Sequence, residues 1–183
     1  MKNLLFYGTT PYSIKLSSSD FNKFSELSKT FNTFVYSTNK NPQYIDHKVV
    51  KIFYIKKFNS YLINYLYFYF INIFSFYKFI KKENIDIVSA KDPIAALIPT
   101  LLLKFKLANF KLVIEHHGDF LNLLMNQRKL YLKKFTIFIS KIISNFTYKN
   151  CDLIRGVHED QTLVLQRKFN KMTLVFPAWV DYK

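Results

Sequence analysis

The sequence is poor in glycine and cysteine, residues on which many nucleotide-binding, metal-binding and disulfide motifs depend. It has three glycines and one cysteine among 183 residues. A single cysteine, Cys151, excludes an internal disulfide and fits a reducing compartment. The sequence contains no GxGxxG motif, no P-loop, no HExxH motif and no GxSxG motif. The usual signatures of phosphate-binding loops, zinc proteases and serine hydrolases are therefore excluded.

Acidic residues are also scarce, with 12 Asp and Glu against 27 Lys and Arg, for a net charge of +15. Such an excess favours a polyanionic partner, namely a nucleic acid, an anionic membrane surface or a phosphorylated substrate. The alternative is codon bias, because Lys, Asn, Ile, Phe and Tyr are enriched together. No RNP-like aromatic motif or recognisable reading helix is present, so no nucleic-acid partner is expected.

One uncharged run, residues 58–77, is long enough at 20 residues to cross a bilayer. It contains three asparagines and five tyrosines, which favours a buried or membrane-facing helix over a membrane span. The apolar run at the N-terminus is too short for a signal peptide and lacks a cleavage site. We therefore expect a cytoplasmic protein, with peripheral attachment to the inner face of the plasma membrane as an open option.

Short apolar runs alternate with helical patterns along the chain. The runs predict strands buried on both faces, at residues 4–7, 33–36, 49–54, 85–89, 111–114, 153–156 and 173–176. Helices are predicted after the N-cap residues Ser19 and Asp20, over 61–82, over 94–107 with Asp92 as its cap, over 121–148 and over 159–169. This order predicts an α/β fold, a doubly wound, Rossmann-like parallel sheet with helices on both faces, in a single domain over residues 1–183.

The predicted helix 121–148 has two distinct faces. One carries apolar residues at steps of three and four, namely Leu132, Phe135, Ile139, Ile142 and Phe146. The other carries the lysines 129, 133, 134 and 141, with Leu130 and Ile137 among them. Two interpretations remain open, a core helix with a solvated lysine face and a helix in the headgroup region of an anionic bilayer.

Ligands of open α/β sheets bind beyond the carboxyl ends of the strands. Four predicted loops at such ends carry polar residues, at 8–10, 90–93, 115–119 and 157–160. The third loop contains two adjacent histidines, His116 and His117, followed by Gly118. Adjacent residues of an extended chain point in opposite directions, so a shared metal site is disfavoured and no metal is expected. An imidazole at this edge could donate to a sugar hydroxyl or to a phosphate oxygen.

Four blocks in this order are similar to motifs of the family-4 glycosyltransferases, retaining enzymes of the GT-B type. The blocks are Asp86-Ile87-Val88 with Asp92-Pro93, then His117-Gly118, then Cys151-Asp152-Leu153-Ile154 with Glu159, and then Phe176-Pro177 with Val180-Asp181. In this family such motifs belong to the acceptor-side, N-terminal domain. Ser17-Ser18-Ser19 stands where the family has a glycine pair.

The resemblance implies the role of each candidate residue. His117 would be the catalytic residue, donating a hydrogen bond to the transferred sugar or the acceptor hydroxyl. The implied substrate-binding residues are Thr9, Thr10, Ser18, Asp92, Gly118, Asp119 and Glu159. The alternative for Asp92 is a structural role, as the cap of its helix.

The resemblance also implies the partners. A nucleotide sugar would be the co-substrate, without a further cofactor, and the acceptor would be a glycan or a lipid-linked molecule of surface polysaccharide or lipopolysaccharide synthesis. The donor-binding domain would lie beyond Lys183 or in a separate chain, so this chain alone is expected to be inactive or nearly so. The alternative is a non-catalytic, Rossmann-like scaffold subunit of a split glycosyltransferase.

Overall fold

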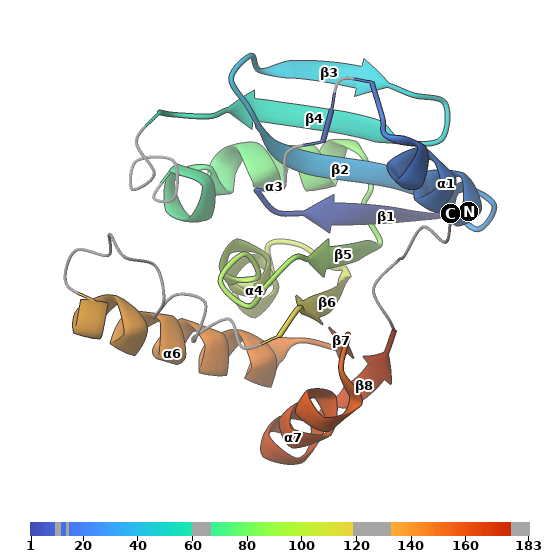
Figure 1. Ribbon diagram of the computed structural model, residues 1–183. Helices are drawn as coiled ribbons and strands as arrows, with labels where there is room; N and C mark the ends of the chain where they lie inside the picture. Colours follow the sequence, from blue (N-terminus) through green and yellow to red (C-terminus); the bar gives the residue numbers. More distant parts are fainter. Residues whose placement is uncertain (10–11, 14, 60–66, 119–132, 177–183) are drawn as a thin grey trace.

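The computed structural model describes residues 1–9, 12–13, 15–59, 67–118 and 133–176 (Figure 1). The strands in these ranges are β1 (Lys2–Tyr7), β2 (Phe31–Asn39), β3 (Gln43–Asp46), β4 (Lys51–Lys56), β5 (Ile87–Ala90), β6 (Lys111–His116), β7 (Leu153–Gly156) and β8 (Met172–Val175). The helices are α1 (Ser18–Ser28), the π-helical turn η1 (Tyr67–Ile71), α3 (Ile73–Lys82), α4 (Leu97–Lys104), α6 (Lys133–Asn150) and α7 (Glu159–Phe169).

The strands form one sheet in the order β3-β4-β2-β1-β5-β6-β7-β8. All pairs are parallel except β3 with β4. In Figure 1 the arrows of β1, β5 and β6 point to the same side, and that of β3 points the opposite way. Each predicted strand is present, and the predicted parallel α/β fold is confirmed. The edge strand β3 was not predicted, because its sequence QYID is polar and only partly buried.

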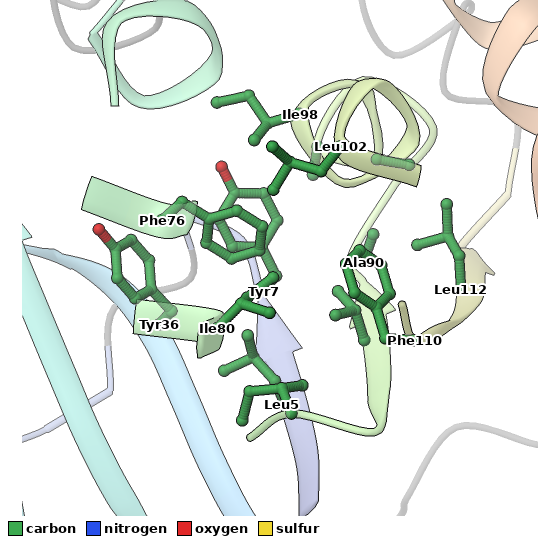
Figure 2. Close-up of a cluster of buried hydrophobic side chains, with 14 of the residues drawn as sticks. Leu5, Tyr7, Tyr36, Phe76, Ile80, Ala90, Ile98, Leu102, Phe110 and Leu112 are labelled. Atoms are coloured by element: carbon green, nitrogen blue, oxygen red, sulfur yellow. The ribbon is translucent and has the colours of Figure 1, made fainter. Parts of the chain in front are cut away.

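The main core lies between the sheet and helices α3 and α4. Figure 2 shows Leu5 and Tyr7 of β1 beside Phe76 and Ile80 of α3, with Ile98 and Leu102 of α4 nearby. The ring centroids of Tyr7 and Phe76 are 4.2 Å apart. Tyr7 is fully enclosed, and its hydroxyl donates to the Phe68 carbonyl at 3.3 Å. A buried tyrosine thus keeps its polar end satisfied, as the low dielectric of a core requires.

A second core lies on the opposite face of the sheet, under α1. Phe24 of α1 is completely buried against Val35, Ile52 and Tyr54 of the strands. Burying a phenylalanine side chain contributes about 2 to 3 kcal/mol. Helices therefore cover both faces, as the sequence predicts.

The N-cap of α1 differs from the prediction by two residues. Ser17 is the cap, because its hydroxyl accepts a hydrogen bond from the backbone N–H of Asp20 at 3.1 Å. Asp92, the predicted cap of helix 94–107, caps the turn before that helix, whereas the N-cap of α4 itself is Ala96. The Asp92 carboxylate accepts from the backbone N–H of Ala95 at 2.7 Å, and regular α-helix begins at Leu97.

The predicted helix over residues 61–82 is only partly described, since residues 60–66 lie outside the described ranges. Its described part is interrupted at Asn72, between η1 and α3. The Asn72 side chain is buried and accepts a hydrogen bond from the Tyr36 hydroxyl at 3.1 Å. Phe76, Phe79 and Ile80 are buried, so α3 is a core helix, one of the two kinds of helix that the sequence favours over a membrane span. No helix of the described residues is both long and apolar enough to cross a membrane.

The orientation of α6 contradicts the predicted apolar face. Phe135 and Ile142 are 61% and 50% exposed, whereas the small hydroxyl residues Ser140, Ser144 and Thr147 are buried together with Tyr148. Helix α6 packs against α4. Small side chains let two helix backbones approach closely, so the hydroxyl stripe faces inward in place of the larger apolar residues. Residues 121–132 of the predicted helix lie outside the described ranges.

Candidate functional site

Four neighbouring strands, β1, β5, β6 and β7, end at one edge of the sheet. The predicted loops follow these strands and are therefore neighbours at that edge. The strand order reverses at β1, with β2 on one side and β5 on the other, which makes the gap between β1 and β5 the topological switch point. A Cβ added to Gly8 would lie 2.7 Å from the Cβ of Lys91. Glycine at position 8 thus allows the loops after β1 and β5 to touch.

The two histidines at the end of β6 point in opposite directions. Nδ1 of His116 lies 2.9 Å from the Tyr148 hydroxyl of α6. Nε2 of His117 lies 2.8 Å from Oε2 of Glu115. The two imidazoles thus contact different partners, Tyr148 and Glu115. The His117 side chain is half exposed, so it is accessible at the carboxyl edge.

Glu115 is the centre of a polar cluster beneath His117. Its side chain is only 10% exposed and has partners on the two flanking strands, β5 and β7, and just past the end of its own strand. Oε1 accepts from the Ser89 hydroxyl at 2.8 Å and from Nη1 of Arg155 at 2.9 Å, while Oε2 faces His117. We call Ser89, Glu115, His117 and Arg155 the Glu115 cluster.

The Glu115 carboxylate is ionised. Burial alone would raise its pKa, but the hydrogen bond with His117, the charge of Arg155 and the hydrogen bond from Ser89 outweigh burial and lower the pKa to about 2. The Arg155 guanidinium also lies over the Phe176 ring, 4.7 Å from its centroid. This stacking fixes the guanidinium against the carboxylate.

Two residues near α1 extend the electrostatic surroundings of the cluster. Burial lowers the pKa of Lys23, and the Glu115 charge acts against that shift. Burial raises the pKa of Tyr12, and the charges of Asp20 and Glu115 add to this effect. Lys23 also lies over the Phe6 ring at 4.6 Å. Lys23 and Arg155 thus both offset part of the negative charge of the buried carboxylate.

Asp92 lies beside the cluster, in the turn after β5. Burial raises the pKa of its carboxyl, while the backbone N–H groups of Ala95 and Ile94 and the nearby Lys91 and His117 act in the opposite direction. Its Oδ1 caps the turn that leads into α4. Asp92 is thus a structural residue close to His117.

The other predicted site residues differ in how near they lie to the Glu115 cluster. Gly118 follows His117 with φ of +101°, a conformation that favours glycine. Thr9 lies half-buried in the loop after β1, next to the switch point. Ser18 and Glu159 are exposed first residues of α1 and α7, and among the described residues neither forms a hydrogen bond with the Glu115 cluster. Thr10 and Asp119 lie outside the described residues and stay predictions.

Sequence reasoning missed Ser89 and Arg155, and it included Glu115 only as the first residue of the loop 115–119. A signal was nevertheless present, because each of these polar residues interrupts an apolar strand shortly before its carboxyl end. In the sheet, Glu115 pairs with Arg155, and Ser89 pairs with Val113. Period-two alternation puts all three side chains on one face of the sheet.

Comparisons with known proteins support the fold. No protein-family model matches the sequence, and the comparison with curated proteins finds no match. Among solved structures, the chain is similar to a sucrose-phosphate synthase from Thermosynechococcus elongatus, with a TM-score of 0.67 and 10% identity over 97% of this chain. A second solved chain of that enzyme gives a TM-score of 0.62 and 11% identity, covering 97% of this chain and 89% of that one.

The present chain spans about half, 48%, of the first of these structures. At such low identity the similarity shows the fold alone. The eight-stranded, mostly parallel sheet with its helices matches one half of a GT-B architecture.

Proposed function

We propose that this chain is the acceptor-side half of a GT-B glycosyltransferase. In this proposal a sugar moves from a nucleotide-sugar donor to a hydroxyl group of a glycan or lipid-linked acceptor. The observation that carries the proposal is His117, a half-exposed imidazole held by Glu115 at the carboxyl edge of the sheet. The structural similarity to sucrose-phosphate synthase supports sugar transfer as the class of reaction.

In such a transfer the acceptor oxygen forms a bond to the sugar while the bond from the sugar to the nucleotide phosphate breaks. The nucleotide leaves with the bonding electron pair, and an oxygen of its phosphate takes up the proton that the acceptor hydroxyl loses. We assign His117 to hydrogen bonding with a hydroxyl of the sugar or the acceptor. Gly118 lets the backbone come close to the ligand, because it lacks a side chain and a Cβ there would meet open space.

Neighbouring residues shape the proposed acceptor site. Thr9 lies beside it in the loop after β1. Asp92 holds the turn after β5 and thereby the floor of the site. Ser18 and Glu159 are assigned to more distant parts of the acceptor. The nucleotide diphosphate would be stabilised mainly by a second, donor-binding domain, since such charge needs preorganised donors that face it.

An exposed surface of α6 supports a lipid-linked acceptor. Phe135, Phe138 and Ile142 are 61%, 60% and 50% exposed, and Lys134 and Lys141 are exposed beside them. Apolar residues between lysines suit the headgroup region of an anionic bilayer. The α6 outer face, as we name these five residues, would attach the protein peripherally to the inner face of the plasma membrane, where surface polysaccharide or lipopolysaccharide precursors are built.

Carbohydrate binding tests the sugar-transfer proposal. Amide NMR spectra of the full chain would be recorded while a panel of methyl glycosides and short glycans is added. A true acceptor should shift the signals of Gly8, Thr9 and Gly118, and His117→Ala should weaken its binding about tenfold or more, the cost of one good hydrogen bond to a substrate. Lys111→Ala is the matched control at the opposite end of β6. If no carbohydrate shifts the edge signals, the proposal is wrong.

Sedimentation with vesicles tests the membrane part separately. The chain should sediment with phosphatidylglycerol vesicles at low salt and be released at high salt, because exposed charges are screened. The double variant Phe135→Ser, Phe138→Ser should reduce sedimentation severalfold. Phe105→Ser is the control, since Phe105 is equally exposed at 69% but lies past the far end of α4. Failure of the unaltered chain to sediment would remove the membrane part and leave sugar transfer untouched.

A further inference from the structure

We propose that Glu115 fixes the tautomer of His117, so that the imidazole presents Nδ1 to the ligand as a hydrogen-bond acceptor. This inference rests on the proposed function, because it concerns the imidazole nitrogen that would bind a sugar hydroxyl. It makes Glu115, supported by Ser89 and Arg155, the positioning residue of the site. It also changes the expectation that His117 acts as a donor.

The first step concerns the proton between Glu115 and His117. An ionised carboxylate has only acceptor oxygens, so the 2.8 Å contact between Oε2 and Nε2 requires the proton to be on Nε2. The carboxylate is kept ionised by its other oxygen, which receives donors from Arg155 at 2.9 Å and Ser89 at 2.8 Å. A neutral imidazole carries one N–H. With that proton on Nε2, Nδ1 has a free lone pair.

The second step concerns which nitrogen a ligand meets. The His117 side chain is half exposed, whereas Glu115, which engages Nε2, is only 10% exposed. Nε2 of His117 therefore faces the buried Glu115 carboxylate and is not available to a ligand. A ligand at the carboxyl edge meets Nδ1, which in the neutral ring accepts a hydrogen bond from a hydroxyl. An unprotonated oxygen of a phosphate or sulfate brings no donor and would not be bound by this atom.

The charges around the pair support this arrangement. Arg155 on β7 and Lys23 on α1 face the carboxylate, with Tyr12 before α1 as a further neighbour. Asp92, after β5, acts electrostatically on the same region. Because Arg155 already pairs with the carboxylate, Glu115 serves His117 as an orienting acceptor. The cluster thus selects a hydroxyl-bearing ligand over a purely anionic one.

The isosteric variant Glu115→Gln gives a directional test. A glutamine offers one acceptor oxygen and one donor NH₂ group. Arg155 can only donate, so the glutamine oxygen should remain at the position of Oε1 and the NH₂ group should face His117. Nε2 would then accept, and the proton would move to Nδ1. The variant therefore converts the ligand-facing nitrogen from an acceptor into a donor.

Long-range ¹H–¹⁵N spectra of the imidazoles distinguish the two tautomers in the full chain. We expect protonated Nε2 and unprotonated Nδ1 for His117 in the unaltered protein, and the reverse in Glu115→Gln. Glu26→Gln, which alters an exposed carboxylate paired with Lys29, should leave the pattern unchanged. Added inorganic sulfate, which has no O–H group and can only accept, should perturb His117 only in Glu115→Gln, because only there does Nδ1 donate.

A proton on Nδ1 of the unaltered protein would overturn the inference, and this measurement needs no variant to fold. An unchanged tautomer in a folded Glu115→Gln protein would overturn it as well. Neither result requires a carbohydrate, so a failure here leaves the glycan-binding test standing. Conversely, if the expected tautomer is found but no carbohydrate binds, the proposed function is wrong and the inference about the tautomer stands.

Discussion

Replacing Glu115 with glutamine should change how the stability of the protein depends on pH. In the folded protein the pKa of Glu115 falls from 4.5 to about 2. A carboxyl whose pKa is lower in the folded than in the unfolded state stabilises the fold when it is ionised. This contribution is fully present above pH 4.5 and is lost as the pH falls toward 2. At ~1.4 kcal/mol per pKa unit it amounts to about 3 kcal/mol, an order-of-magnitude figure.

Urea unfolding followed by circular dichroism at several pH values between 7 and 3 would measure this effect. At pH 7 the free energy of unfolding of Glu115→Gln should be about 3 kcal/mol lower, because the amide leaves Arg155 without its counter-charge. The difference should shrink steadily below pH 4.5, since only the carboxylate titrates. The remaining carboxyl groups are common to both proteins, so their effects cancel in the difference.

The matched control is Glu26→Gln. Glu26 forms an exposed ion pair with Lys29, both side chains being more than half exposed, so its loss should cost under about 1 kcal/mol. A Glu115→Gln difference that stays constant from pH 7 to pH 3 would refute the reasoning. It would mean that the variant loses packing, and that the charge of Glu115 contributes nothing.

Three further changes test the local structure by urea unfolding. Ser17→Ala should lower the free energy of unfolding by about 1 kcal/mol, because the cap of α1 is lost. The control Ser18→Ala should change it by less than about 0.5 kcal/mol. Equal effects of the two changes would mean that Ser17 is not the cap. Gly156→Ala should cost about 1 to 3 kcal/mol because the new Cβ would overlap the Thr162 side chain. Adding Thr162→Ala should recover part of that loss, and full additivity of the two changes would contradict the overlap. Asp92→Asn keeps an acceptor for the cap and removes a buried carboxyl whose pKa is raised, so at neutral pH it should be at least as stable as the unaltered protein. The advantage of the variant in free energy of unfolding should disappear at low pH, because Asp92 is then protonated and no buried charge remains. A variant that is less stable than the unaltered protein at pH 7 but equally stable at pH 3 would contradict this expectation.

Several features of the site follow from local patterns and could be predicted. His116 and His117 are neighbours on a strand, so their opposed directions follow from the strand period of two. Asp92 precedes proline in a position typical of a helix cap, and its carboxylate does accept from Ala95. The partners of Glu115 could not be predicted in this way. Ser89 and Arg155 are 26 and 40 residues away along the chain, and only the pairing of β5, β6 and β7 brings them to one carboxylate.

The sequence by itself determined the class of fold and the edge of the sheet that carries the polar loops. Short uninterrupted apolar runs that alternate with helical segments favour buried strands, and parallel strands bring their carboxyl ends to one edge. The tertiary structure alone decided which residues meet across the sheet and which side of α6 faces inward. In α6 the small Ser140 is buried whereas the larger Phe135 is 61% exposed, an orientation that periodicity does not reveal. Strand register likewise depends on contacts between distant segments, and for this reason the Glu115 cluster is visible only in the folded protein.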